Sequence, residues 1–341
     1  MKKSMKFIAV LLALAMAFSI ASTAEYRPDS GSPADKISGY FTQVSNGTVT
    51  AKNSTEYNHP LATWASRLSY CAYQLKKGEG SWWLSLDEKF GADATIITLL
   101  EDSGFEEENI QSYNTGRNDA TQHIIAHRDI AAAGGARPLI VVTIRGSATF
   151  LGDWVVNIFT ALGWKPDFAT QKGVVLENLD AYLGDHGMKD KEPIFLITGH
   201  SHGAAVGNLL AAHLNDTMGC ENIYAYTFAT PNVQDGGKEP FGNIFNIMNR
   251  NDVVTWLPNS TFGGRENTWI RHGVDYHIDM PIPDYMPISQ WIAADPTGFF
   301  GHHPAVYVNW MERKEERTQQ EMDDISEDCP VGFLPRLIYL K

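Results

Sequence analysis

Residues 193–207 decide the fold, and they read Pro193-Ile-Phe-Leu-Ile-Thr-Gly-His-Ser-His-Gly-Ala-Ala-Val-Gly207. The stretch opens with an apolar run, 194–197, of residues that favour strands. After the turn, residues 204–214 are small and apolar at a spacing typical of a helix. The pattern therefore predicts a strand, a tight turn and a helix, with Ser201 at the apex of the turn.

A Gly-x-Ser-x-Gly turn between a strand and a helix is typical of the nucleophile elbow of α/β-hydrolases. Gly199 and Gly203 are required for steric reasons, because a side chain at either position would collide with the neighbouring strand or helix. An ordinary Gly-rich turn is the plain alternative, and the flanking strand and small-residue helix favour the elbow. We expect an α/β-hydrolase fold, with a central, mostly parallel sheet flanked by helices.

The first 24 residues predict a signal peptide. Three lysines precede an apolar run, 7–20, and small residues follow at 21–24. The run is shorter than the roughly 20 residues that a membrane span needs, and a retained anchor is the alternative. The Met-Lys-Lys start suggests a bacterial protein that is secreted into the extracellular medium. We expect residues 25–341 to form a single, monomeric domain with an acidic C-terminal tail.

The charge of the chain excludes some classes of partner. The formal net charge is −13, and loss of Lys2, Lys3 and Lys6 with the signal peptide would bring it to −16. Such a protein is not attracted to nucleic acids or to anionic membrane surfaces. The three cysteines, Cys71, Cys220 and Cys329, allow one disulfide and lack a zinc spacing.

Outside the elbow, the apolar pattern predicts strands alternating with helices, and hence a largely parallel sheet. We expect residues 25–36 to be mobile, 131–136 to form a loop, and His123 and His127 to be surface residues of a strand. The expected elements are a hairpin at 40–50, strands at 123–130, 139–144, 223–228, 243–248 and 269–278, and helices at 61–75, 85–100, 174–183 and 312–321.

A serine nucleophile needs a base, and the base needs an acid that orients it. In α/β-hydrolases these follow the serine in the order acid, then histidine. Asp252 follows an apolar strand, where sites form in α/β sheets, although a helix-capping or turn aspartate is the alternative. His302 and His303 come later in a loop and are both candidates for the base.

Several blocks in one order resemble the class 3 lipases, the fungal-lipase-like family of α/β-hydrolases. The resemblance extends from about Leu61 to Met311. Its blocks are Arg145-Gly146-Ser147 with Asp153-Trp154, Gly199 to Gly203, Thr227 to Pro231, Asn251 to Pro258, Arg271 to Tyr276, and His302 to Tyr307.

The resemblance implies a role for each matching residue. Ser201 would be the nucleophile, Asp252 the orienting acid and His302 the base, with His303 as the alternative base. The backbone N–H groups of Ser147 and His202 would form the oxyanion hole. Separately, the apolar stretch 150–164 reads as a lid, an acyl-site wall or part of the core, and its candidate substrate contacts are Phe150, Trp154, Ile158 and Phe159.

Three positions depart from the family pattern. His202 replaces the usual leucine, Gln171-Lys-Gly-Val174 replaces His-x-Gly-Phe, and Thr255-Trp256 replaces Pro-Arg. His200 and His272 match structural positions. A metal site built from His200, His202 and the 302–303 pair is disfavoured because no carboxylate or cysteine completes it. We expect no metal and no cofactor.

The expected function is a secreted serine carboxylic-ester hydrolase that acts on acyl lipids through an acyl-enzyme, like a triacylglycerol lipase. Its partner would be the acyl-ester lipid, with transient contact at a lipid interface. Other ester-chemistry alternatives are a phospholipase A1, a short-chain or feruloyl-type esterase, and an acyltransferase. A serine peptidase is disfavoured by the lipase-like blocks. The non-enzymatic alternative is a secreted binding protein on an inactive hydrolase fold.

Overall fold

The computed structural model describes residues 33–45, 48–74, 95–113, 122–132, 135–146, 167–257, 268–279 and 300–328. Several sequence predictions fall outside these ranges. They are the signal peptide at 1–24, residues 85–94 of the helix predicted at 85–100, the oxyanion residue Ser147, the stretch 150–164, and the end of the acidic tail, 329–341, with Cys329.

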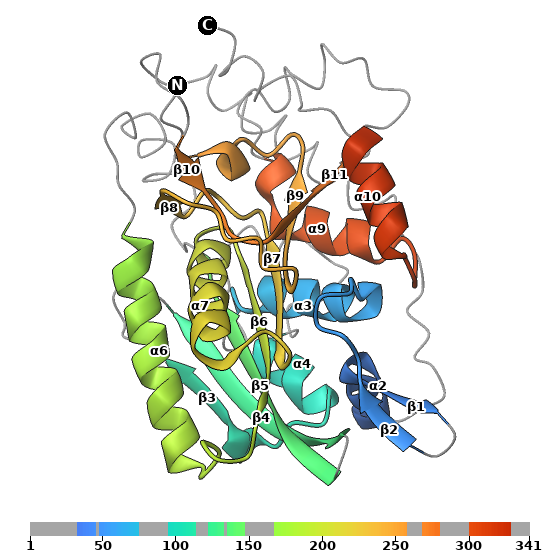
Figure 1. Ribbon diagram of the computed structural model, residues 1–341, viewed down its shortest axis with the longest axis vertical. Coiled ribbons are helices and arrows are strands. Elements are labelled where there is room, and N and C mark those ends of the chain that lie inside the picture. Colours follow the sequence, from blue (N-terminus) through green and yellow to red (C-terminus); the bar gives the residue numbers. More distant parts are fainter. Residues whose placement is uncertain are drawn as a thin grey trace, which may run out of the picture.

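A seven-stranded sheet forms the centre of the molecule (Figure 1). In spatial order its strands are β11 (Val274–Ile278), β9 (Ile244–Asn249), β7 (Ile223–Phe228), β6 (Ile194–His200), β5 (Gly135–Ile144), β4 (His123–Ala132) and β3 (Ile110–Tyr113). The five strands from β5 to β11 run parallel, whereas β3, β4 and β5 pair antiparallel. The mostly parallel sheet predicted from the sequence is confirmed.

The sheet carries a separate apolar core on each face. Alternate residues of a strand point to opposite faces, so in β6 Leu196 packs in one core and Ile197 in the other. One face is covered by α6 (Phe168–Asp185) and α7 (His202–Met218) (Figure 1). The other is covered mainly by α2 (Pro33–Phe41), α3 (His59–Cys71), α4 (Ile96–Asp102) and α9 (Pro304–Met311). With the strand–turn–helix at Ser201, this is the predicted α/β-hydrolase fold.

A separate hairpin accompanies the central sheet, and the β4–β5 pair within the sheet is longer than predicted. The predicted hairpin at 40–50 forms from β1 (Thr42–Ser45) and β2 (Thr48–Ala51), which pair antiparallel. The loop predicted at 131–136 is instead mostly strand, because β4 continues to Ala132 and β5 begins at Gly135. Pairing between the two strands extends them further than their own apolar pattern predicts.

The N-terminal and C-terminal helices differ from the predictions. Part of the supposedly mobile 25–36 belongs to α2, whose Ile37 and Phe41 are buried in the core. The helix predicted at 312–321 is absent, because α9 ends at Met311 and α10 (Gln319–Asp328) starts a new helix. Thr318 and Glu321 form reciprocal side-chain hydrogen bonds to each other's backbone N–H, a capping box that fixes this start.

Two further predictions are wrong. His123 and His127 are buried rather than at the surface, because α6 covers their face of β4. The strand predicted at 269–278 is split into β10 (Trp269–Ile270) and β11 by a turn at Gly273. Gly273 has φ +88°, and a Cβ there would lie 2.3 Å from the carbonyl oxygen of Ile244, so only glycine fits.

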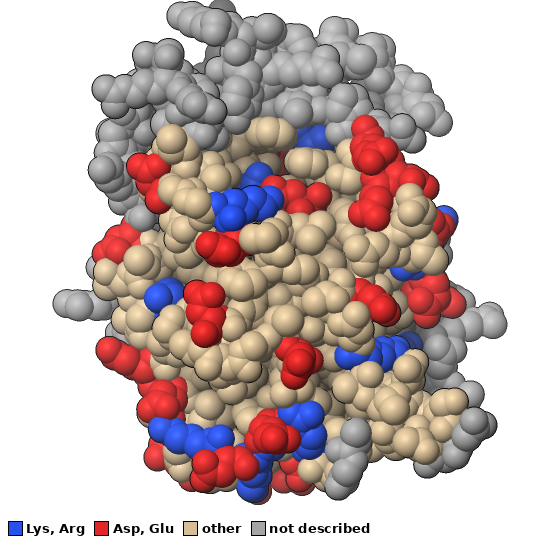
Figure 2. Space-filling model, in the orientation of Figure 1, with Lys and Arg blue, Asp and Glu red and all other residues tan. Residues whose placement is uncertain are grey.

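The surface agrees with the acidic composition. Figure 2 shows acidic side chains spread over this face between large uncharged areas, with fewer lysines and arginines among them. Within the described ranges, no helix combines the length and the apolar character that crossing a membrane requires.

Candidate active site

Ser201 occupies the sharp turn between β6 and α7. Its φ of 58° and ψ of −122° lie outside the regions that L-residues ordinarily adopt. The turn is held by a hydrogen bond from Ser201 N–H to Phe228 O at 2.9 Å, and by Ala205 N–H to Ser201 O at 3.1 Å. The strained turn presents the serine side chain at the carboxyl end of the central strand.

The two glycines of the motif allow three backbone segments to meet. A Cβ on Gly203 would lie 2.1 Å from the carbonyl oxygen of Ile144, at the end of β5. A Cβ on Gly199 would lie 2.7 Å from the backbone of Gly203 and 2.8 Å from the same Ile144 oxygen. Non-bonded atoms cannot approach so closely, so the steric requirement for glycine that was predicted from the sequence agrees with the packing.

Ser201, His302 and Asp252 form a continuous chain of hydrogen bonds. Ser201 Oγ lies 2.8 Å from His302 Nε2, and His302 Nδ1 lies 2.8 Å from Asp252 Oδ2. A carboxylate accepts, so Nδ1 carries the proton and Nε2 presents a lone pair to the serine hydroxyl. All three residues are buried, with at most 3% of their surface exposed. The arrangement can withdraw a proton from the serine.

His303, the alternative base, has a different position. Its Nδ1 accepts a hydrogen bond from Ala305 N–H at 3.1 Å and caps the N-terminus of α9. His302 ends the short 3-10 helix η5 (Phe300–His302), one residue earlier. The structure therefore brings His302, and not His303, to the serine and the aspartate by these hydrogen bonds.

Asp252 is held by donors from two elements besides His302. It follows β9 and precedes the 3-10 helix η4 (Val253–Trp256), and its Oδ1 accepts from Val254 N–H at 3.0 Å. Its Oδ2 also accepts from the Tyr307 hydroxyl, on α9, at 2.7 Å. Burial, together with the neighbouring Asp252 carboxylate, raises the pKa of Tyr307 well above its usual value, so the phenol keeps its proton. A buried carboxylate is stable only with such donors.

The sequence analysis placed Tyr307 in the same family block as His302 but did not predict it as a partner of Asp252. A tyrosine one turn into the helix that follows the base is the signal that would have indicated it. The Tyr307 oxygen also accepts from Asn249 N–H at 3.0 Å, which ties α9 to the end of β9.

His200 connects the serine turn to the loop of the base. Its Nε2 lies 2.8 Å from His302 O, and its Nδ1 lies 2.8 Å from the Tyr73 hydroxyl. A carbonyl only accepts, so Nε2 carries the proton and Nδ1 accepts from Tyr73. Burial and then the neighbouring His302 lower the pKa of His200 far below its usual value. His200 is thus a neutral structural contact, in the kind of role predicted for it.

Arg271 ties together the loops around the acid, a role that no sequence signal beyond the family block indicates. Its Nη1 donates to Thr230 O at 2.6 Å and to Thr255 O at 2.5 Å, and its Nε to Asp275 Oδ2 at 3.2 Å. Thr255 in turn donates its hydroxyl to Asp252 O at 2.8 Å. The loops after β7 and β9 are therefore fixed to the start of β11.

Of the two predicted oxyanion donors, the structure describes only His202. It is the first residue of α7, so its backbone N–H belongs to the helix turn whose N–H groups lack intrahelical acceptors. The imidazole of His202 contacts Phe168 and Gln171 of α6. Ser147 and the four candidate lid contacts, Phe150, Trp154, Ile158 and Phe159, lie outside the described residues.

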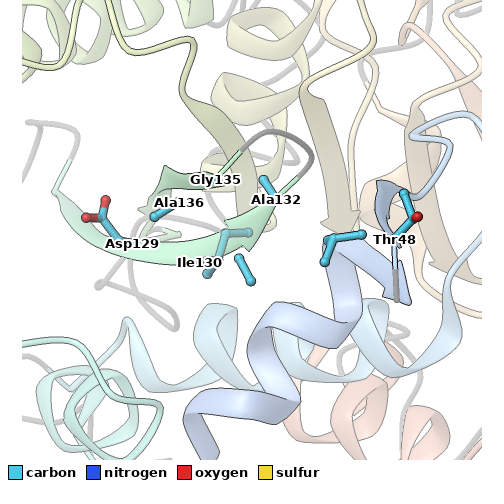
Figure 3. Close-up of a pocket in the computed structure, with 8 residues that line it drawn as sticks. Thr48, Asp129, Ile130, Ala132, Gly135 and Ala136 are labelled. Atoms are coloured by element: carbon cyan, nitrogen blue, oxygen red, sulfur yellow. The ribbon is translucent and has the colours of Figure 1, made fainter. Parts of the chain in front are cut away.

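A pocket of about 640 Å³ lies elsewhere, between β2 and the paired ends of β4 and β5 (Figure 3). Gly135 at its edge begins β5, and the opposite end of β5 meets the serine turn. The pocket is therefore separate from Ser201. Thr48 and Asp129 are the polar side chains that Figure 3 labels there, and neither is part of a nucleophile–base pair in the described contacts. Within the described ranges no three histidine, cysteine or acidic residues are grouped to hold a metal.

Comparison with protein families gives a match to the family described as lipase (class 3), over residues 141–262. The matched stretch includes Ser201 and Asp252 and ends before His302. The match confirms the class 3 lipase resemblance identified from the sequence. Because lipases hydrolyse carboxylic esters, it also confirms the expected enzyme class, a carboxylic-ester hydrolase.

Solved fungal lipases overlap with this structure only in part. The triacylglyceride lipase of Rhizomucor miehei is 21% identical, with 64% of this chain and 78% of that chain covered and a TM-score of 0.42. The mono- and diacylglycerol lipase of Aspergillus oryzae is 19% identical, with 68% and 82% covered and a TM-score of 0.39. Comparison with curated protein sequences gave no significant match.

Proposed function

We propose that this chain, whose residues 141–262 match the class 3 lipases, is a secreted serine hydrolase of acyl-lipid esters that uses Ser201, His302 and Asp252 as its catalytic triad. The observation that carries the proposal is the unbroken hydrogen-bond chain from the serine hydroxyl through the imidazole to the carboxylate. A serine hydroxyl is a weak nucleophile by itself, and this chain supplies both the base and the group that orients it.

Acylation would begin when Ser201 Oγ attacks the ester carbonyl and transfers its proton to His302 Nε2. Asp252 would stabilise the resulting imidazolium through Nδ1–H, as the acid does in serine triads. The ester C–O bond then breaks, and His302 returns the proton to the departing alcohol. Water, deprotonated by the same imidazole, would then attack the acyl carbonyl. The bond from the carbonyl carbon to Ser201 Oγ breaks, Oγ takes the proton back from His302, and the carboxylic acid leaves.

The tetrahedral intermediate in each half-reaction carries a negative oxygen, which needs fixed donors. We assign this role to the backbone N–H groups of His202 and Ser147. The N–H after the nucleophile serves this role in α/β-hydrolases, and the start of α7 adds the positive end of a helix dipole. Loss of one such donor in other enzymes costs about 3 kcal/mol of transition-state stabilisation.

The substrate class rests on the family and on composition. The stretch 150–164 is apolar and aromatic, and it follows the strand that ends beside the serine turn. We propose that it contacts the acyl chain through Phe150, Trp154, Ile158 and Phe159, as a lid or a wall. An acidic protein is repelled by anionic membranes, so contact with uncharged lipid interfaces fits best. Residues 1–24 remain a predicted signal peptide for secretion from a bacterium.

The test is the rate of hydrolysis of p-nitrophenyl acetate, butyrate, octanoate and palmitate by the mature chain and by its Ser201→Ala variant. We expect the wild type to prefer the longer chains, and the variant to retain no turnover above background. A preference for acetate and butyrate would favour a short-chain esterase and make 150–164 a wall. Release of fatty acid from the sn-1 position of phosphatidylcholine would favour a phospholipase A1.

The same test addresses the non-enzymatic alternative. If no ester is turned over in a Ser201-dependent way while the protein is folded, the proposal is wrong and a binding protein on an inactive hydrolase fold becomes the better account. Far-UV circular dichroism of both proteins provides the folding control.

A further inference from the structure

Two positions that depart from the class 3 lipase pattern meet in the structure. His202 stands where a leucine is usual, directly after the nucleophile, and Gln171 stands in the block where the family carries His-x-Gly-Phe. The imidazole Nε2 of His202 makes a short hydrogen bond with Oε1 of Gln171, across the contact between α7 and α6. Where the family pattern has a histidine on α6, this chain has Gln171, and it carries a histidine on α7 instead, at position 202.

The contact lies where two helices begin. His202 is the first residue of α7, and Gln171 lies in the first turn of α6, which Asp167 caps by accepting from Thr170 N–H at 3.0 Å. Phe168, also in that turn, packs edge-to-face against the His202 ring, with centroids 5.1 Å apart at 62°. The ring is therefore held by an aromatic contact and a hydrogen bond at once.

The partners of the ring define its protonation. A carboxamide oxygen only accepts, so Nε2 of His202 carries a proton and donates it to Gln171. Burial lowers the pKa of His202 to about 4, so the ring is neutral at neutral pH. A neutral donor paired with a neutral acceptor places no added charge beside Ser201.

The backbone of residue 202 is thereby fixed from two sides. On one side, Gly203 packs so closely on β5 that a Cβ would lie 2.1 Å from Ile144 O. On the other side, the His202 ring is bound to α6. Between them lies the N–H that the proposed mechanism aims at the oxyanion, and such donors act well only when their position is fixed in advance.

We propose that His202 and Gln171 are positioning residues, which together fix the backbone N–H of residue 202 toward the oxyanion of acyl-lipid ester hydrolysis. The pair acts through this backbone donor and does not take part in proton transfer. The inference rests on the proposed function for its catalytic consequence, but the pairing itself can be tested without turnover.

The first arm of the test measures the pairing by NMR of ¹⁵N-labelled histidine in the full mature chain. In the wild type, His202 should be a neutral Nε2–H tautomer that does not protonate between pH 8 and 5. In Gln171→Glu, the new carboxylate should raise the pKa of His202 by at least about one unit. A His202 that titrates near 6.5 in both proteins would overturn the pairing, whatever the activity.

The second arm measures the catalytic consequence. Gln171→Leu should lower kcat on p-nitrophenyl butyrate about three- to tenfold, the effect of one hydrogen bond, with KM within about twofold. His202→Leu should behave similarly. The double variant, which restores an apolar pair, should recover to within about threefold of wild type, because the effects of residues in contact are not additive. Val174→Ala, at an exposed position on the same helix, is the matched control and should retain wild-type kcat.

The outcomes separate the two proposals. Wild-type kcat in both single variants, with lowered melting temperatures, would reduce the pair to a stability contact and overturn the positioning role. A double variant whose kcat loss equals the product of the two single losses would also overturn it, because the two residues would then act separately. A confirmed NMR pairing with no Ser201-dependent turnover in the wild type would contradict the proposed function and, with it, the catalytic half of this inference.

Discussion

At the scale of single residues, the most informative feature is the set of donors around Asp252. The carboxylate is fully buried, and it accepts from His302, from the hydroxyl of Tyr307 and from Val254 N–H. A buried charge without partners would be protonated or would destabilise the fold. These donors satisfy the carboxylate oxygens and orient them toward the imidazole, which is what a base of this kind requires.

Removal of the phenol should therefore weaken catalysis without removing any member of the triad. We expect Tyr307→Phe to lower kcat about tenfold with little change in KM, since a hydrogen bond to a charged group contributes about 1.5–3 kcal/mol. Tyr224→Phe is the matched control, because that hydroxyl donates to Lys52 O at 2.6 Å from the opposite end of the sheet. If the two variants have equal kcat, the Tyr307 hydroxyl does not orient the acid.

At the scale of elements, the active site depends on how closely β6, α7 and β5 approach one another. The small residues of α7 that follow Ser201 are buried against the sheet, and Gly203 has no room for a methyl group. This explains why a motif of five residues fixes the geometry of elements that are far apart in the sequence.

Two glycine substitutions should have opposite effects on stability. Gly203→Ala should lower the free energy of unfolding by about 3 kcal/mol or more, because the added Cβ meets a backbone carbonyl. Gly173→Ala lies within α6, where nothing lies within 4 Å of the new Cβ, and it should raise stability by about 0.5–1 kcal/mol. Urea unfolding followed by circular dichroism measures both. Equal effects would contradict the packing described at the elbow.

The sequence predicts those features whose evidence is local. The strand–turn–helix, the order of serine, aspartate and histidine, and the strands of the parallel sheet could all be derived from short stretches. The start of α10 was equally readable from the Thr318–Glu321 capping box, but the charged pattern before it suggested one continuous helix. The choice between His302 and His303 could not be derived, because the two adjacent residues differ only in the direction that the local backbone gives their side chains.

Long-range partners could not be predicted. Tyr73 reaches His200, and Arg271 reaches Thr230, across wide separations in the sequence. Only the folded sheet brings these groups together, and neither carries a local signature. The pairing of Gln171 with His202 belongs to the same class: each residue was visible as a departure from the family pattern, and the contact between them was not.

At the scale of the whole molecule, several buried or half-buried histidines are neutral. Burial lowers the pKa of His59, His127 and His202 to about 4, and it lowers the pKa of His200 well below its usual value. In the unfolded chain these groups protonate near pH 6.5. Between pH 6.5 and 5 the unfolded state therefore binds protons that the folded state does not, and stability must fall as the pH falls.

We expect the contribution of these histidines to the free energy of unfolding, measured in urea, to be constant above about pH 7 and to decrease below pH 6.5. Each such histidine contributes up to about 1.4 kcal/mol per pH unit. His59 donates to Met311 O at 2.9 Å and contacts the Tyr57 hydroxyl. His59→Gln removes this titrating group, so the slope of unfolding free energy against pH should fall by about the contribution of one histidine. A stability that stays level from pH 7 to pH 5 would contradict the buried, neutral state of these side chains.

The central claim is that Ser201 is a nucleophile activated by His302. The most direct measurement is covalent labelling by a fluorophosphonate, followed by mass spectrometry of the peptides, in the wild type, His302→Ala and His303→Ala. We expect one label per chain, on Ser201, with a rate that falls by orders of magnitude in His302→Ala and stays near wild type in His303→Ala. Labelling at another residue, or at Ser201 with equal rates in the wild type and His302→Ala, would contradict it.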